Sequence, residues 1–189
     1  MSDLLRFTDV ACWRGGRLLF TDLSLSLAGG EGLWLRGPNG VGKSSALRLA
    51  AGLLQPMSGT IKAAPAALAD EALALDRELP LRRALAFWTA ANAAAKLEAA
   101  LEALDLSRLA EVPVRLLSTG QARRARLARV AASDARLWLL DEPLSGLDEI
   151  SIALVTALLD RHRAAGGAVL LTSHQPLPSQ GWRTVEIAA

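Results

Sequence analysis

One stretch of this sequence combines glycines, a lysine and a serine at a spacing that suits phosphate binding. Residues 37–44 read Gly-Pro-Asn-Gly-Val-Gly-Lys-Ser and lie between an apolar run and a segment with helical character. Glycines let backbone N–H groups turn toward phosphate oxygens, and the helix that follows adds partial positive charge. The pattern predicts a P-loop in which Lys43 reaches the β- and γ-phosphates of a nucleotide and the Ser44 hydroxyl ligates magnesium.

A second candidate site is the pair of acids Asp141 and Glu142, which directly follows the apolar run Leu137–Leu140. The run is typical of a central parallel strand, and such sheets bind ligands at the carboxyl ends of their strands. Asp141 can hold magnesium opposite Ser44, and Glu142 can take or orient the proton of an attacking water. Acids at this place also cap helices, but beside a P-loop the pair favours nucleotide hydrolysis.

Three further features have ordinary structural interpretations when taken alone. Ser118, in the run Leu-Ser-Thr-Gly-Gln, is a good N-cap for the segment after it, and the same helix start could bind an anion. Trp13 can be a core residue or an aromatic face for adenine. His174 follows the apolar run Ala168–Ser173, and a lone histidine there is more often structural than catalytic.

The elements that must hold these groups alternate between strands and helices. Short apolar or alternating runs predict strands at Leu4–Val10, Leu18–Leu27, Gly32–Arg36, Leu137–Leu140 and Ala168–Ser173. A helix is expected from about Lys43 to Ala51, with Gly52 suited to its cap, and an amphipathic helix is expected over 150–161. Recurring leucines predict helical structure over about residues 71–133. This order indicates an α/β sheet with a helical insertion, in a single domain of residues 1–189.

The composition restricts the class of protein. The 189 residues are 51% apolar with a net charge of +2, which allows one packed domain and gives no electrostatic reason to expect a nucleic acid partner. The arginines at 123, 124, 126 and 129 are interpreted as a solvated helix face. The start of the chain lacks the pattern of a secretory signal, and no apolar run approaches bilayer-spanning length, so a membrane role requires a partner. The single cysteine, Cys12, fits a reducing compartment.

Taken together, the motifs resemble those of the nucleotide-binding subunit of ABC transporters. GPNGVGKSS, LSTGQ, LWLLDEP, SGLD and LLTSHQ occur in that family's order and at its usual separations. The resemblance implies a P-loop NTPase fold of the ABC ATPase type, with a mostly parallel core sheet, an antiparallel β-subdomain and a helical insertion. It also implies hydrolysis of ATP with Mg²⁺. The ATP-binding residues would be Trp13, Gly37, Pro38, Asn39, Gly40, Val41, Gly42, Lys43, Ser44 and Ser45.

The resemblance also implies a homodimer on ATP binding. The residues that match the family's signature loop are Ser118, Thr119, Gly120 and Gln121. They would act on the ATP held by the P-loop of the other subunit, while Gly146 and Asp148 would line the dimer seam. His174 matches the switch histidine, and it would contact the γ-phosphate and act in catalysis with Lys43 and Glu142.

Within this family the chain is most similar to the haem exporter ATP-binding subunit of cytochrome c maturation. The segments that carry the similarity are EGLWLRGPNGVGKSSALRLAAGLL, LSTGQARRARLAR and GGAVLLTSHQPL. They imply integral membrane partner subunits, a peripheral place on the cytoplasmic face of the bacterial inner membrane, and ATP-driven release of a haem-loaded chaperone. The expected partner surface is the insertion near Arg82, Arg83, Phe87 and Trp88, although amphipathic packing also explains that pattern. No nucleic acid partner and no direct membrane insertion are expected.

One part of the family pattern is missing. Its members carry a glutamine at the start of the insertion that touches magnesium and senses the membrane partner, whereas Gln55 lies too early for this role. Asp70 and Glu71 occupy the expected place. Either an acid substitutes for the amide, with Glu71 favoured over Asp70, or the contact is absent.

Three other functions stay open on the sequence. The chain could serve a transporter of another small solute. It could be a soluble ABC protein that acts on DNA or ribosomes, for which the arginine cluster is the only hint. It could also hold ATP without turning it over, although the presence of Lys43, Asp141, Glu142 and His174 argues against that.

Overall fold

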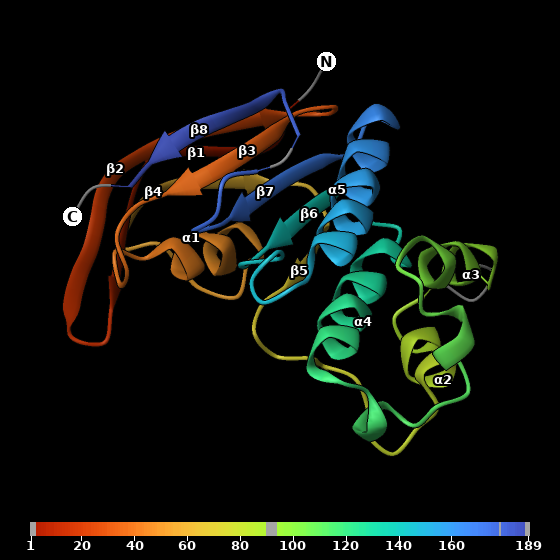
Figure 1. The fold of residues 1–189 in the computed structure, drawn as a ribbon. Coiled ribbons are helices and arrows are strands. Elements are labelled where there is room, and N and C mark those ends of the chain that lie inside the picture. The colour runs from red at the N-terminus through yellow and green to blue at the C-terminus, as the bar shows by residue number, and fades with distance from the viewer. Residues whose placement is uncertain (1–2, 90–93, 178, 188–189) are drawn as a thin grey trace.

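The computed structural model describes residues 3–89, 94–177 and 179–187, and it contains two sheets with helices between and beside them (Figure 1). An antiparallel sheet has the order β2-β1-β4, with β1 at Asp3–Arg14, β2 at Arg17–Ala28 and β4 at Ser58–Ala63. Gly15 and Gly16 connect β1 and β2 with φ angles of 60° and 78°, which suits glycine in a two-residue hairpin turn. This sheet is the antiparallel β-subdomain expected from the sequence.

The second sheet is entirely parallel and has the order β5-β6-β7-β3-β8. Its strands are β3 (Gly32–Arg36), β5 (Ala66–Ala69), β6 (Leu137–Leu140), β7 (Ala168–Thr172) and β8 (Trp182–Glu186). The predictions of β3, β6 and β7 are confirmed, whereas β4, β5 and β8 are not among the predicted strands. Because all five strands are parallel, the segments that follow β3, β5, β6 and β7 leave the sheet at one edge.

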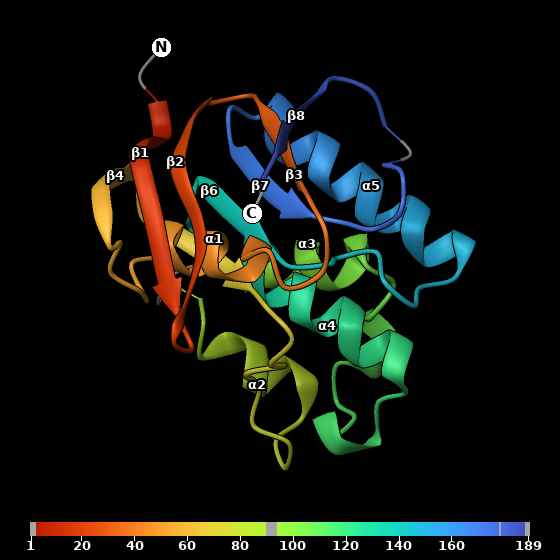
Figure 2. The same ribbon diagram turned by 90° about the vertical axis from the view of Figure 1, so that its left-hand side faces the viewer.

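The strands of the parallel sheet are apolar on both faces because each face packs on a different core. Leu137 and Leu139 contribute to a core with β1, β2 and α1 (Lys43–Ala50). Trp138 and Leu140 contribute to a core with α4 (Thr119–Ala131) and α5 (Glu149–Ala164). Figures 1 and 2 show α1 on one side of this sheet and α4 with α5 on the other. The helix after the P-loop is therefore packed between the two sheets.

The insertion consists of α2 (Leu81–Ala86), α3 (Ala94–Ala103), two short 3-10 turns (Ser107–Leu109 and Val114–Leu116) and α4. The prediction of helix from residue 71 is wrong for residues 71–80, and residues 90–93 lie outside the described ranges. Asp70 Oδ1 accepts the Ala72 N–H at 3.2 Å, and Asp76 Oδ1 accepts the Glu78 N–H at 3.0 Å. These local side-chain bonds compete with helix formation and hold the segment in turns.

The prediction that the arginine cluster forms a solvated helix face is wrong for two of its members. Arg126 and Arg129 on α4 are each only 8% exposed. Both guanidinium groups reach backbone carbonyls at the end of β5. Sequence periodicity places these arginines on α4, but it does not reveal which carbonyls another element brings within their reach.

Candidate functional site

The predicted P-loop lies between β3 and α1, at the edge where the parallel strands end. Gly37 and Gly42 have φ angles of 147° and 112°, in the region that disfavours L side chains. A Cβ atom on Gly37 would lie 2.6 Å from the Ile187 carbonyl oxygen, and one on Gly42 would lie 2.9 Å from the Phe20 ring. Among the described residues no side chain caps α1 at Gly42. The loop therefore requires glycine, and the first N–H groups of α1 are available to an anion.

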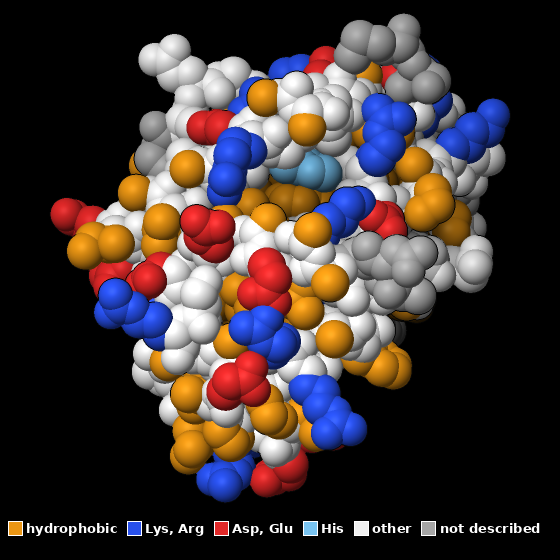
Figure 3. Space-filling view, turned by 90° about the vertical axis from the view of Figure 1, so that its right-hand side faces the viewer, with side chains coloured by type: hydrophobic (Ala, Val, Ile, Leu, Met, Phe, Trp, Pro, Cys, Tyr) orange, Lys and Arg blue, Asp and Glu red, His pale blue; other side chains and the backbone are white. Residues whose placement is uncertain are grey.

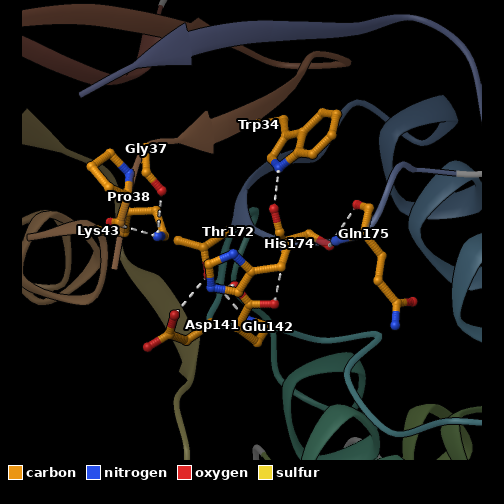
Figure 4. Close-up of polar contacts among 10 residues, drawn as sticks. Trp34, Gly37, Pro38, Lys43, Asp141, Glu142, Thr172, His174 and Gln175 are labelled. Carbon is orange, nitrogen blue, oxygen red and sulfur yellow. Dashed lines mark hydrogen bonds and ion pairs between the residues drawn. The ribbon is translucent and has the colours of Figure 1, made fainter. Parts of the chain in front are cut away.

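The Lys43 side chain lies across the P-loop and is 9% exposed. Its Nζ donates hydrogen bonds to the carbonyl oxygens of Gly37, at 2.8 Å, and Pro38, at 3.1 Å (Figure 4). Both acceptors are neutral, so these bonds orient the ammonium group without neutralising its charge. An anion in the loop would meet that charge at short range, where it is screened weakly.

Asp141 is fixed by a buried threonine on the neighbouring strand. The Thr172 hydroxyl donates to Asp141 Oδ1 at 2.7 Å and accepts the backbone N–H of Glu142 at 3.0 Å. Thr172 has no exposed surface, and Asp141 is 8% exposed. One hydroxyl thus orients both consecutive acids. Thr172 is not among the residues predicted for the site, although a hydroxyl at the end of an otherwise apolar strand is a signal that could have identified it.

Glu142 and His174 face each other across the end of the sheet (Figure 4). The backbone N–H of His174 donates to Glu142 Oε2 at 3.1 Å, and His174 Nε2 lies 3.4 Å from Glu142 Oε1. Oε1 is buried and forms no hydrogen bond with the described residues. Glu142 also has a φ of 49°, a conformation that is costly outside glycine and is often found at functional sites. Oε1 therefore has acceptor capacity that the described residues do not use.

The P-loop and the acids line one cleft with a volume of about 440 Å³. The predicted residues that it brings together are Asn39, Gly40, Gly42, Lys43, Ser44, Ser45, Glu71, Asp141, Glu142 and His174. Arg14 and Arg17 also line it, although they were not predicted. The Arg14 guanidinium donates to Ser45 Oγ at 3.3 Å, and the Arg17 guanidinium donates to the Gly40 carbonyl at 3.0 Å. Two basic residues that flank a Gly-Gly turn are the signal in the sequence from which these cleft residues could have been predicted.

Trp13 lies outside the lining of this cleft. Its side chain is 56% exposed near the end of β1, and it lines a separate shallow depression with Gln55 and Met57. The exposure excludes a core role for this indole. Stacking of Trp13 on adenine remains a prediction.

The two acids at the expected place of the missing glutamine have different surroundings. The Asp70 carboxylate pairs with the Arg48 guanidinium at 3.3 Å and also accepts the Ala72 N–H. Glu71 lines the P-loop cleft together with Ser44 and Asp141. Of the two acids, only Glu71 belongs to that lining.

A second cavity, of about 400 Å³, lies on the insertion side of the acids. Glu71, Thr119, Arg123, Arg126, Asp141 and Glu142 are among the residues that line it. Ser118 and Gln121 form a reciprocal capping box at the start of α4, with hydrogen bonds of 3.3 and 2.8 Å. The space next to Gly120 is open, since a Cβ atom there would meet nothing within 4 Å. The start of α4 is therefore both capped and accessible.

Gly146 and Asp148 lie in the segment between the acids and α5. Gly146 has a φ of 63° and contacts the Arg123 guanidinium directly. Asp148 is the N-cap of α5 and accepts the Ser151 N–H at 2.8 Å. Hydrogen bonds from the Ser151 side chain and backbone lower the pKa of Asp148. Both residues have a structural role within this chain, and their place at a dimer seam remains a prediction.

Comparison with known proteins supports the geometry. A family model described as "ABC transporter" matches residues 20–145, which include the P-loop and both acids but not His174. The chain is 54% identical over 177 residues to the cytochrome c biogenesis ATP-binding export protein CcmA of Sphingopyxis alaskensis, covering 92% of this chain and 91% of that protein. It is 51% identical over 183 residues to the protein of the same name from Zymomonas mobilis, covering 95% and 82%.

A solved structure of the ATP-binding subunit of an ABC transporter has the same fold. It superposes with a TM-score of 0.82 at 24% identity, over 90% of this chain and 79% of that chain. At this identity the likeness concerns the arrangement of the elements, including the parallel sheet and the antiparallel sheet beside it.

Proposed function

The chain belongs to the ABC transporter family, and within it to the ATP-binding export proteins of cytochrome c biogenesis; from this premise we propose its role in the cell. The protein powers a haem-handling membrane complex and does so as an ATP-bound dimer. Its activity as an ATP-hydrolysing subunit follows from the family. The observation that carries the assignment is the single cleft in which Lys43 and Ser44 face Asp141, Glu142 and His174.

In the proposed mechanism the P-loop and Lys43 bind the β- and γ-phosphates, and Glu142 accepts or orients the proton of the attacking water. Lys43 and the N-terminus of α1 supply fixed positive charge where negative charge develops in the transition state. His174 lies beside Glu142, where its ring can contact the γ-phosphate. Thr172 keeps Asp141 and Glu142 in place through its two hydrogen bonds.

The cleft also fits a magnesium ion. Ser44, Asp141 and Glu71 supply oxygen atoms to one cleft beside the phosphate-binding loop, and Mg²⁺ usually takes one or two carboxylates together with substrate phosphates. When bound, the ion would neutralise charge on the phosphate oxygens. Ser44 and Asp141 would hold it, with Glu71 in place of the family's glutamine.

This role of Glu71 predicts a selective effect on metal use. The change Glu71→Ala should raise the Mg²⁺ concentration that gives half-maximal ATPase activity about tenfold, because it removes an oxygen donor from the metal side of the cleft. Nucleotide affinity measured in EDTA should stay within about twofold. Titration of activity with Mg²⁺ would check this. Asp70→Ala serves as the comparison. If Asp70→Ala alone raised the Mg²⁺ concentration needed for half-maximal activity, the role would belong to Asp70.

The dimer is proposed from the family relation and from the accessible start of α4. The signature loop at residues 118–121 would act on the partner subunit's ATP, with Gly146 and Asp148 along the seam. Ile150, in the first turn of α5, is 75% exposed and would be covered by such contacts. The P-loop cleft of one chain alone contains no residue of the 118–121 loop. A second chain would supply it.

The partner surface is proposed to be on the insertion. Phe87 is 81% exposed, Trp88 40% and Leu116 59%, so three large apolar side chains on this part of the chain reach solvent. The face in Figure 3 mixes acidic and basic side chains with apolar ones and carries no stripe of a single charge. Arg82 pairs with Glu98 and Glu111, which leaves Arg83 as the basic group of the predicted patch without such a pair in the described ranges. This mixture favours a protein partner.

No helix in the described part of the chain has the length and apolar character needed to cross a bilayer. We propose that integral membrane subunits recruit the protein to the cytoplasmic face of the bacterial inner membrane. There, ATP turnover would drive release of a haem-loaded chaperone.

The deciding experiment is deletion of the gene in its own host. Membranes of the deletion strain should lose covalently bound haem in a haem-stained gel, because c-type cytochromes would not mature. A plasmid copy of the wild type should restore the stain, and a Lys43→Ala copy should not. Normal c-type cytochromes in a strain without a second copy of the gene would end the haem assignment. Turnover by the purified protein would still support an ATPase that serves another solute.

A further inference from the structure

Two buried arginines of α4 are not explained by the mechanism above. Arg126 Nη1 donates to the Asp70 carbonyl oxygen at 2.6 Å, and Arg129 Nη2 donates to the Leu68 carbonyl oxygen at 2.6 Å. Leu68 lies in β5, and Asp70 is the first residue after it. The insertion therefore holds the end of β5 and the segment that carries Glu71 by the backbone.

Stability alone does not require charged residues at these positions. Burial lowers the pKa of Arg126 and of Arg129, because taking the guanidinium out of water disfavours its charged form. Each Nε atom is buried without a hydrogen-bond partner among the described residues. Apolar residues of similar volume often replace buried charges with little loss of stability. What the guanidinium groups supply here is a charge-assisted hydrogen bond to a chosen carbonyl.

The position of Arg126 connects three parts of the site. It lines the second cavity with Glu71, Thr119 and Asp141, and its guanidinium donates to the Asp70 carbonyl in the same segment as Glu71. Arg126 is also on the helix whose first residues form the signature loop. Any movement of the start of α4 would therefore be passed to the carbonyl next to Glu71.

Trp88 connects the same segment to the exposed surface of the insertion. The Arg129 guanidinium lies 4.6 Å from the centre of the Trp88 ring, and Trp88 Nε1 donates to the Ala74 carbonyl at 3.0 Å. Phe87, which is 81% exposed, packs edge-on against Trp88 with the ring centres 5.4 Å apart. The carbonyls of Leu68, Asp70 and Ala74 are thus all held by side chains of the insertion.

We propose that Arg126 and Arg129 are positioning residues that fix the 68–74 segment, so that the Glu71 carboxylate stays at the metal side of the P-loop cleft. The inference rests on the proposed ATPase function and on Glu71 at the metal. The two arginines set the position of Glu71, and through them α4 and Trp88 are physically connected to Glu71. Displacement of α4 or Trp88 would move Glu71 and change metal use without altering the P-loop.

The test compares Arg126→Met with Arg124→Met as a matched control. Arg124 is on the same helix, and its Nη1 donates to the Leu104 carbonyl at 2.7 Å, but that carbonyl lies within the insertion. Arg126→Met should raise the half-saturating Mg²⁺ concentration about tenfold and leave nucleotide affinity in EDTA within about twofold. Hydrogen exchange of the amides in residues 70–74 should also become faster. Arg124→Met should change the melting temperature without these effects.

A double-mutant cycle separates positioning from a general loss of structure. If Arg126 acts through Glu71, the double variant Arg126→Met/Glu71→Ala should need no more Mg²⁺ than Glu71→Ala alone. The proposal would be overturned if the two changes raised the required Mg²⁺ concentration by factors that multiply in the double variant. It would also be overturned if Arg126→Met had the same Mg²⁺ requirement as Arg124→Met. Should Arg126→Met fail to fold, Arg126→Lys keeps the charge and should give a smaller shift of the same kind. Absence of ATPase activity in the wild type would instead reject the proposed function itself.

Discussion

Replacement of Lys43 by alanine is expected to abolish ATP turnover and to weaken nucleotide binding. The Lys43 ammonium is held across the P-loop by two neutral carbonyls, so its charge is fixed where the phosphates would lie. Loss of one preorganised group of this kind typically costs about 3 kcal/mol in the transition state, which corresponds to a rate decrease of more than 100-fold. Release of phosphate from MgATP by the purified protein measures this directly.

The matched control for this change is Lys62→Ala. Lys62 is an exposed lysine on β4, outside the residues that line the P-loop cleft. Its replacement should leave turnover within about twofold of the wild type, because exposed charges far from a site contribute little. Wild-type turnover by Lys43→Ala would show that the P-loop assignment is wrong. Equal losses in both variants would point to a general effect of charge.

The change Glu142→Gln is expected to stop hydrolysis while preserving ATP binding, so that an ATP-bound dimer accumulates. The amide oxygen can still accept the His174 N–H, which now donates to Glu142 Oε2 at 3.1 Å, so the local geometry should be kept. The amide cannot take a proton from water, and general-base catalysis usually contributes about 10² to 10⁴ in rate. Turnover should therefore fall by at least about 100-fold.

Size-exclusion chromatography with ATP measures the dimer, and Glu102→Gln provides the control. Glu102 is an exposed acid on α3, and its change should leave both turnover and the monomer–dimer distribution unaltered. A Glu142→Gln protein that binds ATP but elutes only as a monomer would contradict the proposed dimer. A Glu142→Gln protein that still hydrolyses ATP at the wild-type rate would remove Glu142 from the role of base.

The parts of the fold that follow from short sequence windows were predictable. The P-loop requires glycine at positions such as Gly37 and Gly42 for local reasons, and α1 begins at Lys43 as predicted. The strands β6 and β7 are continuous apolar runs because both faces of the sheet are covered. In each case the signal in the sequence and its structural cause lie within a few residues of one another.

The parts that depend on distant partners were not predictable. β5 reads Ala-Ala-Leu-Ala, which has the composition of a helix, and it is a strand only because β6 pairs with it. Arg126 and Arg129 have the spacing of a helix surface, yet β5 brings carbonyl oxygens to them. Thr172 becomes important only through Asp141 on the neighbouring strand. For such residues the local pattern is the same whether or not the partner is present.

The position of β3 in the parallel sheet has a consequence for synthesis of the chain. β3 lies between β7 and β8, with Leu33 opposite Leu170 on one side and opposite Arg183 on the other. Both partners are synthesised long after β3, so the strand that leads into the P-loop has exposed edges until they emerge from the ribosome. Unpaired strand edges template aggregation, and long-range parallel pairing forms slowly. A growing chain is therefore expected to depend on chaperones that shield the edges of β3 until β7 has been made.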